Sequence, residues 1–118
     1  MPRLLDTPSQ IPVPGGKLID EYVGRVATGT DAVSVARMTA PPGWSEPAQR
    51  PEFYEITLVL TGEVVVEHDG GPTSVRAGQA LLTYAGERVR YLVGDEGASY
   101  VAICVPAFGP DLAGREEG

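Results

Sequence analysis

Glycine and proline interrupt this chain at short intervals, and no other feature limits its fold as much. The 118 residues include 15 glycines and 11 prolines. Glycine weakens regular secondary structure, and proline lacks the N–H group that a helix or a central strand needs. The intervals between these residues suit short strands better than long helices. Since a chain of this length can bury the core of one domain, we expect a single all-β domain.

The sequence segments between the glycines and prolines have the composition of β-strands. Residues 53–60 are rich in β-branched and aromatic side chains, and residues 31–40 alternate, with Val33, Val35, Arg37 and Thr39 on one face. Further strands are predicted at 64–68, 72–78, 79–84, 87–93 and 98–105, with turns at 61–63 and 94–97 and a hairpin at 69–71. Residues 17–29 fit either an edge strand or a short amphipathic turn. About seven or eight short strands without a convincing helix indicate an antiparallel sandwich or barrel.

Three regions follow from this pattern. Residues 1–16 are rich in proline and are expected to form an extended N-terminal lead-in. Residues 17–108 are expected to form the β-barrel. Residues 109–118 have little to bury and are expected to form a flexible C-terminal tail.

Charge and composition limit the partners and the compartment. The net charge is −7, which disfavours binding to nucleic acid or to an anionic membrane surface. No apolar run approaches the length of a membrane span, and no signal-peptide core is visible at the N-terminus, so a cytoplasmic location is expected. Cys104 is the only cysteine and lies in an apolar segment, which favours a buried, unreactive thiol. The only histidine, His68, flanks the hairpin and is expected at the surface.

The spacing of glycines around one glutamate identifies the type of barrel. Gly43, Gln49, Pro51, Glu55 and Gly62 follow the first motif of the cupin superfamily, Gly-x5-His-x-His-x3-Glu-x6-Gly. The second motif, Gly-x5-Pro-x-Gly-x2-His, is matched by Gly78 and Gly86, while Tyr84 replaces its proline and Val89 its histidine. The chain therefore resembles cupins over residues 31–106, and especially the small bacterial cupins, some ethanolamine-utilisation-like, that lack the histidines. The resemblance implies a single cupin-like antiparallel β-barrel, or jelly roll.

The departures from the motifs bear on metal binding. In metal-binding cupins, the histidines and the glutamate of these motifs are the ligands, and here only Glu55 is retained in kind. Gln49 offers an amide oxygen, whereas Pro51 and Val89 offer no ligand, so neither a transition metal nor another cofactor is expected. An oxygen-ligand metal site around Glu46, Gln49 and Glu55 remains an alternative. The simpler interpretation of Glu46 and Glu52 is that they are solvated loop charges.

A metal-free pocket around Glu55 is the preferred interpretation. The alternation groups Phe53, Thr57 and Val59 with Glu55, and it groups Tyr91 and Val93 with Val89 on the later strand. The resemblance to cupins implies that both of these faces point inward. Arg37 is the expected cationic partner of Glu55, or Arg88 or Arg90 if the alternation shifts by one residue. The predicted ligand-binding residues are Arg37, Gln49, Phe53, Glu55, Thr57, Tyr84, Val89 and Tyr91.

Two classes of function fit such a pocket. One is a barrel that binds a small organic metabolite, and the other is a metal-free isomerase, lyase or cyclase with Glu55 as general base. The sequence does not decide between them. Residues 56–66 are apolar on both faces of the predicted strands, and the outer face needs a cover. We therefore expect a homodimer, which the resemblance to small cupins also implies.

Overall fold

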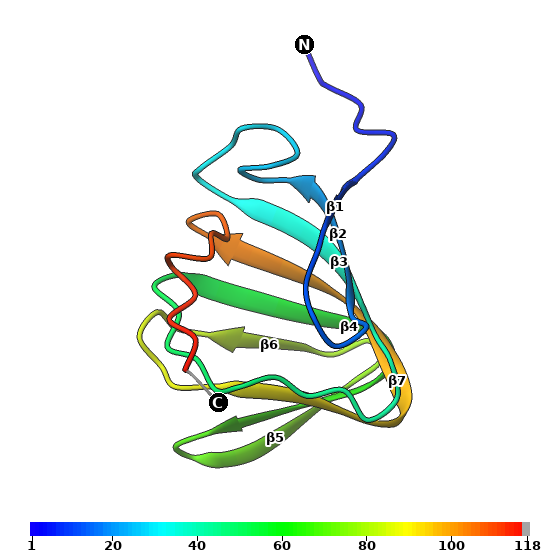
Figure 1. Cartoon of the computed structure of the whole chain (residues 1–118), viewed down its shortest axis with the longest axis vertical. Coiled ribbons are helices and arrows are strands. Elements are labelled where there is room, and N and C mark those ends of the chain that lie inside the picture. Colours follow the sequence, from blue (N-terminus) through cyan, green and yellow to red (C-terminus); the bar gives the residue numbers. More distant parts are fainter. Residues whose placement is uncertain (117–118) are drawn as a thin grey trace.

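The computed structural model describes residues 1–116, which form antiparallel strands (Figure 1). Their bounds are β1 Ser9–Ile11, β2 Leu18–Val23, β3 Ser34–Ala40, β4 Tyr54–His68, β5 Gly71–Arg76, β6 Ala80–Thr83 and β7 Arg90–Val105. The strands pair in the order β1-β2-β3-β7-β4-β5, and β6 pairs with β4. The predicted all-β antiparallel fold is thus confirmed. Within the described residues, no helix is long and apolar enough to cross a bilayer.

The two longest strands, β4 and β7, pair with each other along most of their length. The first half of β4 pairs with β6 and the second half with β5, while β7 follows it on the other side. The predicted turns at 61–63 and 94–97 are wrong, because both strands continue and their register shifts around Gly62 instead. Gly62 has a φ of 77°, which lets β4 bend without reversing.

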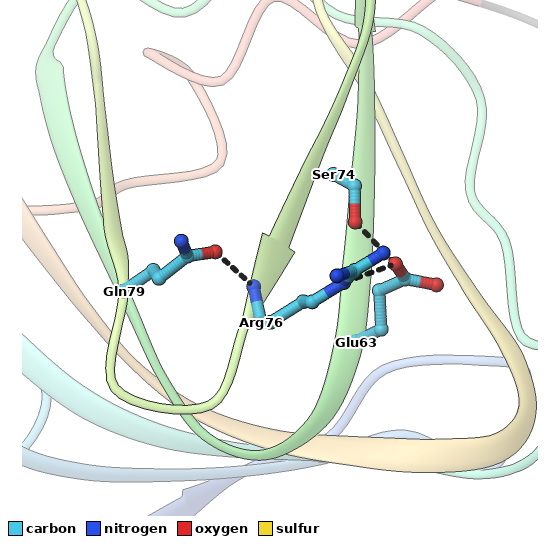
Figure 2. A network of polar contacts seen from close by, with 4 residues as sticks. All are labelled: Glu63, Ser74, Arg76 and Gln79. Atoms are coloured by element: carbon cyan, nitrogen blue, oxygen red, sulfur yellow. Dashed lines mark hydrogen bonds and ion pairs between the residues drawn. The ribbon is translucent and has the colours of Figure 1, made fainter.

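The predicted hairpin at 69–71 is confirmed, and polar side chains bind its strands together near Gly62. The Ser74 hydroxyl donates a hydrogen bond to Glu63, and Arg76 Nε donates to the same carboxylate at 3.5 Å (Figure 2). The main-chain N–H of Arg76 donates to the side-chain oxygen of Gln79 at 3.0 Å. These contacts fix β4, β5 and the turn into β6 on the exposed side of the barrel.

The N-terminal region resolves the ambiguity over residues 17–29. Residues 18–23 form strand β2, and the following turn is fixed by Glu21, whose buried carboxylate accepts hydrogen bonds from the N–H groups of Val26 and Ala27 at 3.1 and 3.0 Å. The lead-in contains the short strand β1, which pairs with β2. This pairing brings the connection between β1 and β2 against the barrel interior.

Residues 109–116 differ from the loose tail that the sequence led us to expect. They pack along the loop that precedes β4 through main-chain hydrogen bonds from Arg50 to Gly114, from Glu52 to Leu112 and from Glu116 to Ala48, each 2.8–2.9 Å long. Ala113 is buried. Residues 117 and 118 of the predicted tail lie outside the described residues.

The alternation predicted for β4 and β7 is confirmed, and it divides the barrel into a packed end and a hollow end. Phe53, Glu55, Thr57 and Val59 are buried, whereas the residues between them face outward. The packed end consists of side chains from β4, β5, β7 and the preceding loops, among them Val59, Val64, Val66, Val75, Val89 and Val93. The opposite end, between β2, β3 and β7, encloses the cavity described next.

Candidate functional site

The hollow end of the barrel contains a cavity of about 380 Å³. Its walls are mostly apolar and come from β2, β3, β4 and β7. Residues 11–14 line it as well, and so do Phe108, Pro110, Ala113 and Arg115. The cavity is therefore formed by both terminal regions in addition to the barrel strands. The polar side chains that line it are Lys17, Glu21, Ser34, Glu46, Gln49, Glu55, Tyr91, Tyr100 and Arg115.

Glu55 lies on the inner face of β4 and lines this cavity, as the sequence predicted. The Tyr91 hydroxyl, from β7, donates a hydrogen bond to Glu55 Oε1 at 3.4 Å. Burial raises the pKa of Glu55 to about 7, although the charge of Lys17 opposes this rise. At neutral pH, Glu55 therefore exists in both its acidic and its ionised form, which suits a group that exchanges protons.

Lys17 is the cation that shares the cavity with Glu55. It lies in the connection between β1 and β2, and its Nζ is 4.3 Å from the centre of the Trp44 ring and 5.4 Å from that of Tyr100. Burial lowers the pKa of Lys17, while the carboxylates of Glu46 and Glu55 act in the opposite direction. The ammonium thus lies between aromatic faces at the edge of an apolar space.

The prediction that Arg37 is the partner of Glu55 is wrong. Arg37 is exposed on the outer face of β3, because its neighbours Ala36 and Met38 take the inward positions and line the cavity. The alternatives Arg88 and Arg90 also face away, and they form ion pairs with Glu116 and Glu67 at 2.6 and 3.1 Å. No shift of the alternation occurs that would turn them inward.

The loop before β4 places Glu46 and Gln49 at the cavity. It runs antiparallel to the start of β7, where Gln49 and Val89 exchange two main-chain hydrogen bonds of 2.9 Å (Figure 1). Glu46 is not the solvated loop charge expected from the sequence, because it lies against the cavity and burial raises its pKa. Arg115 Nη2 lies 3.3 Å from Glu46 Oε2. Glu52, in contrast, is exposed as expected.

The other predicted ligand-binding residues divide into three groups. Phe53, Gln49 and Tyr91 line the cavity with Glu55. Thr57 and Val89 point inward but are buried in the packed interior, and the Thr57 hydroxyl has no hydrogen-bond partner within residues 1–116. Tyr84 faces outward and packs edge-on against Tyr54, with ring centres 5.9 Å apart, so its assignment to the pocket is wrong.

The residues present do not fit the metal that cupin motifs often hold. Of the four motif positions, only Gln49 and Glu55 carry a donor atom, and the Val89 side chain belongs to the packed core. The Lys17 ammonium lines the same space and would repel a cation there. Within the described part of the chain, no group of three or more His, Cys, Asp or Glu side chains could hold a metal ion. The oxygen-ligand site around Glu46, Gln49 and Glu55 is therefore disfavoured.

Sequence reasoning missed Lys17, Glu21 and Arg115 as cavity residues. Lys17 carried a signal, because it is the only lysine in a chain that otherwise uses arginine for its side-chain cations. Glu21 and Arg115 carried none, since their positions depend on the pairing of β2 and on the path of residues 109–116. Tyr100, on β7, also lines the cavity.

The fold and the hollow end together define a cupin-type barrel, and comparison with known proteins places the chain in a family. A family described as "Cupin domain" matches residues 36–105, and the chain belongs to it. A protein of Myxococcus xanthus named endoribonuclease YbeY is 51% identical over 107 residues, which are 90% of this chain and 36% of that protein. The chain thus spans about a third of the length of this relative.

Solved structures agree with the fold. The Streptomyces protein PAC13, in a histidine-to-glutamine variant solved with uridine, is similar with a TM-score of 0.76 at 13% identity, over 97% of this chain and 88% of that one. A Salmonella typhimurium protein described as a putative ethanolamine utilization protein Q is similar with a TM-score of 0.61 at 19% identity, over 78% and 71% of the two chains. At these identities, the likeness concerns the fold alone.

Proposed function

We propose that this cupin binds a small organic metabolite in the cavity around Glu55 without a metal ion. The observation that carries the proposal is the cavity itself, about 380 Å³ of mostly apolar space into which a few charged side chains project. Small-molecule sites commonly combine an apolar enclosure with a small number of polar groups that orient the ligand. Glu55, Lys17 and Gln49 supply those groups here.

Native mass spectrometry of the protein tests this proposal after incubation with the small-molecule fraction of a cell extract and a metal chelator. We expect one organic molecule bound to each wild-type chain. Ala102→Leu should abolish this binding, because Ala102 lines the cavity and the larger side chain fills part of it. Val101→Leu, on the opposite face of the same strand, is the matched control and should bind as the wild type does.

A second candidate function is that of a metal-free isomerase, lyase or cyclase in which Glu55 transfers the proton. It is favoured by one observation, the raised pKa of about 7 of Glu55, together with the hydrogen bond from Tyr91. Once a molecule is known to bind, the rates at which the wild type and Glu55→Gln convert it test whether Glu55 acts as the base. Turnover that Glu55→Gln leaves unchanged would remove Glu55 as the base.

The endoribonuclease name of the Myxococcus protein does not carry over to this chain. That protein is nearly three times the length of the matched segment. The net charge of −7 on this chain opposes binding to a phosphate backbone, and the only histidine, His68, is held at the hairpin by hydrogen bonds with Thr73 and Gly70. We expect no nuclease activity from this chain alone. A cytoplasmic location remains our proposal, on the basis of composition.

The outer face of the sheet supports a homodimer. Side chains that project from β4, β6 and the end of β7 leave an exposed apolar surface, here called the outer patch: Tyr54, Ile56, Leu58, Leu60, Leu82, Tyr84 and Val105. All but Tyr84 lie on strands that pair with one another, and Tyr84, directly after β6, packs against Tyr54, so the patch is continuous. Contiguous apolar surface of this kind marks interaction sites. A second copy of the chain, presenting the same patch, is the simplest cover.

A further inference from the structure

Lys17 is distinct from every other side-chain cation of this protein. The other eight basic side chains are all arginines, and the one lysine of the sequence lines the cavity. Arginine stays protonated under all conditions that proteins experience, whereas a buried lysine loses its proton more easily. The position therefore holds the only side-chain cation of the chain that can become a neutral amine.

The surroundings of Lys17 leave its nitrogen available. Within residues 1–116, no carboxylate oxygen lies within 4.0 Å of its Nζ, and the amine takes part in no side-chain hydrogen bond. The rings of Trp44 and Tyr100 lie beside the nitrogen, and the apolar cavity lies next to it.

We propose that Lys17 forms a reversible imine with the carbonyl carbon of a small aldehyde or ketone held in this cavity. The proposal rests on the proposed function, because it names the class of molecule that the cavity takes. It adds a covalent step to that binding, and it assigns the step to a residue outside both cupin motifs.

The step uses only groups that the cavity supplies. The neutral amine of Lys17 adds to the carbonyl carbon and gives a carbinolamine. Its carbon–oxygen bond then breaks, and the oxygen leaves as water with a proton from the acidic form of Glu55. The resulting iminium loses its N–H proton to the Glu55 carboxylate, so one amine and one carbonyl give one imine and one water, without oxidant or reductant. Glu55 can make this exchange because it lines the same cavity as Lys17, and the aromatic faces beside Lys17 stabilise the cationic iminium.

Reductive trapping tests the proposal. The protein is incubated with butanal and sodium cyanoborohydride near neutral pH, which converts an imine into a stable butyl amine, and peptide mapping locates the product. The control is Arg76→Lys, which places a second lysine on an exposed site of the same chain and keeps its charge opposite Glu63. We expect Lys17 to be labelled faster than the introduced lysine, because burial lowers the pKa of Lys17 and so raises its fraction of neutral amine.

Two further measurements complete the test. Glu55→Gln should slow the labelling of Lys17 and leave that of the introduced lysine unchanged. If the introduced lysine is labelled while Lys17 in the folded protein is not, the imine is excluded. That failure is distinct from a failure of the proposed function, because native mass spectrometry of the wild type would still show a bound organic molecule if the cavity binds without a covalent bond.

Discussion

Glu55 and Lys17 face the same apolar cavity, and each loses hydration on folding. Burial raises the pKa of the acid and lowers the pKa of the base, so both side chains move toward neutrality. The hydrogen bond from Tyr91 and the charge of Lys17 only partly offset the effect on Glu55. Such a pair costs stability in the absence of a partner, and a bound polar group would relieve this cost.

The pH dependence of folding reports on Glu55. In the folded protein, the carboxyl group of Glu55 keeps its proton up to a pH of about 7, whereas in the unfolded chain it releases the proton near pH 4.5. Folding therefore takes up a proton between these values, and the free energy of unfolding falls as the pH rises from about 4.5 to about 7, then levels off. The free energy of unfolding of Glu55→Gln should not fall over this pH range. Above pH 7 it should exceed that of the wild type by about 3 kcal/mol.

Urea denaturation of both proteins between pH 4.5 and 8 measures this difference. The two stabilities should converge at the acidic end, where Glu55 is neutral and glutamine resembles it in shape. A constant difference across the whole range would mean that Glu55 titrates as an ordinary carboxylate.

At the scale of elements, the bend of β4 depends on Gly62. Its φ of 77° is unfavourable for other residues, and a Cβ there would lie 2.1 Å from the main-chain oxygen of Gly97. Gly62→Ala should therefore cost about 3 kcal/mol or more. Gly43→Ala is the matched control, because Gly43 has a φ of 75° but open space around its Cβ position, and it should cost only about 1–2 kcal/mol.

Thermal and chemical unfolding of the two variants give the comparison. Equal losses would show that only the backbone angle matters at Gly62. The close approach of β4 and β7 would then not limit the residue at this position.

The sequence was informative wherever a local rule governs the structure. Alternation placed Glu55 and Tyr91 inside, and the spacing of Gly43, Gly62, Gly78 and Gly86 predicted the barrel, since all four adopt positive φ angles of 75–88°. The turns predicted around Gly62 and at 94–97 were wrong because a glycine can permit a bulge as well as a reversal of the chain.

The sequence predicted less well which residues line the cavity. Lys17 and Arg115 lie 98 positions apart in the sequence, and they reach one cavity only through long-range pairing of the terminal regions. Arg37 was chosen for its charge. The alternation of its strand grouped it with Val33 and Val35, and only the structure shows that this face points outward. Local pattern thus predicted the inner faces of the strands, and the segments that complete the site required the structure.

At the scale of the whole molecule, the outer patch predicts self-association. Ile56→Asp and Leu58→Asp each place a charge in its middle, where both side chains are 38% exposed, so neither should disturb the interior. We expect a dimer for the wild type and a monomer for each variant at micromolar concentration by analytical ultracentrifugation. Val26→Asp, at an exposed apolar site in the turn after β2, should remain dimeric. A wild-type monomer would contradict the homodimer.

Our central proposal is that the cavity binds an organic molecule without a metal ion, and a crystal structure tests it most directly. The protein would be treated with a chelator, incubated with the small-molecule fraction of a cell extract, and measured with anomalous data at the edges of the common transition metals. We predict density for an organic molecule in contact with Glu55 and Lys17, without an anomalous peak. An anomalous peak beside Gln49 and Glu55, or a cavity without organic density, would contradict this account.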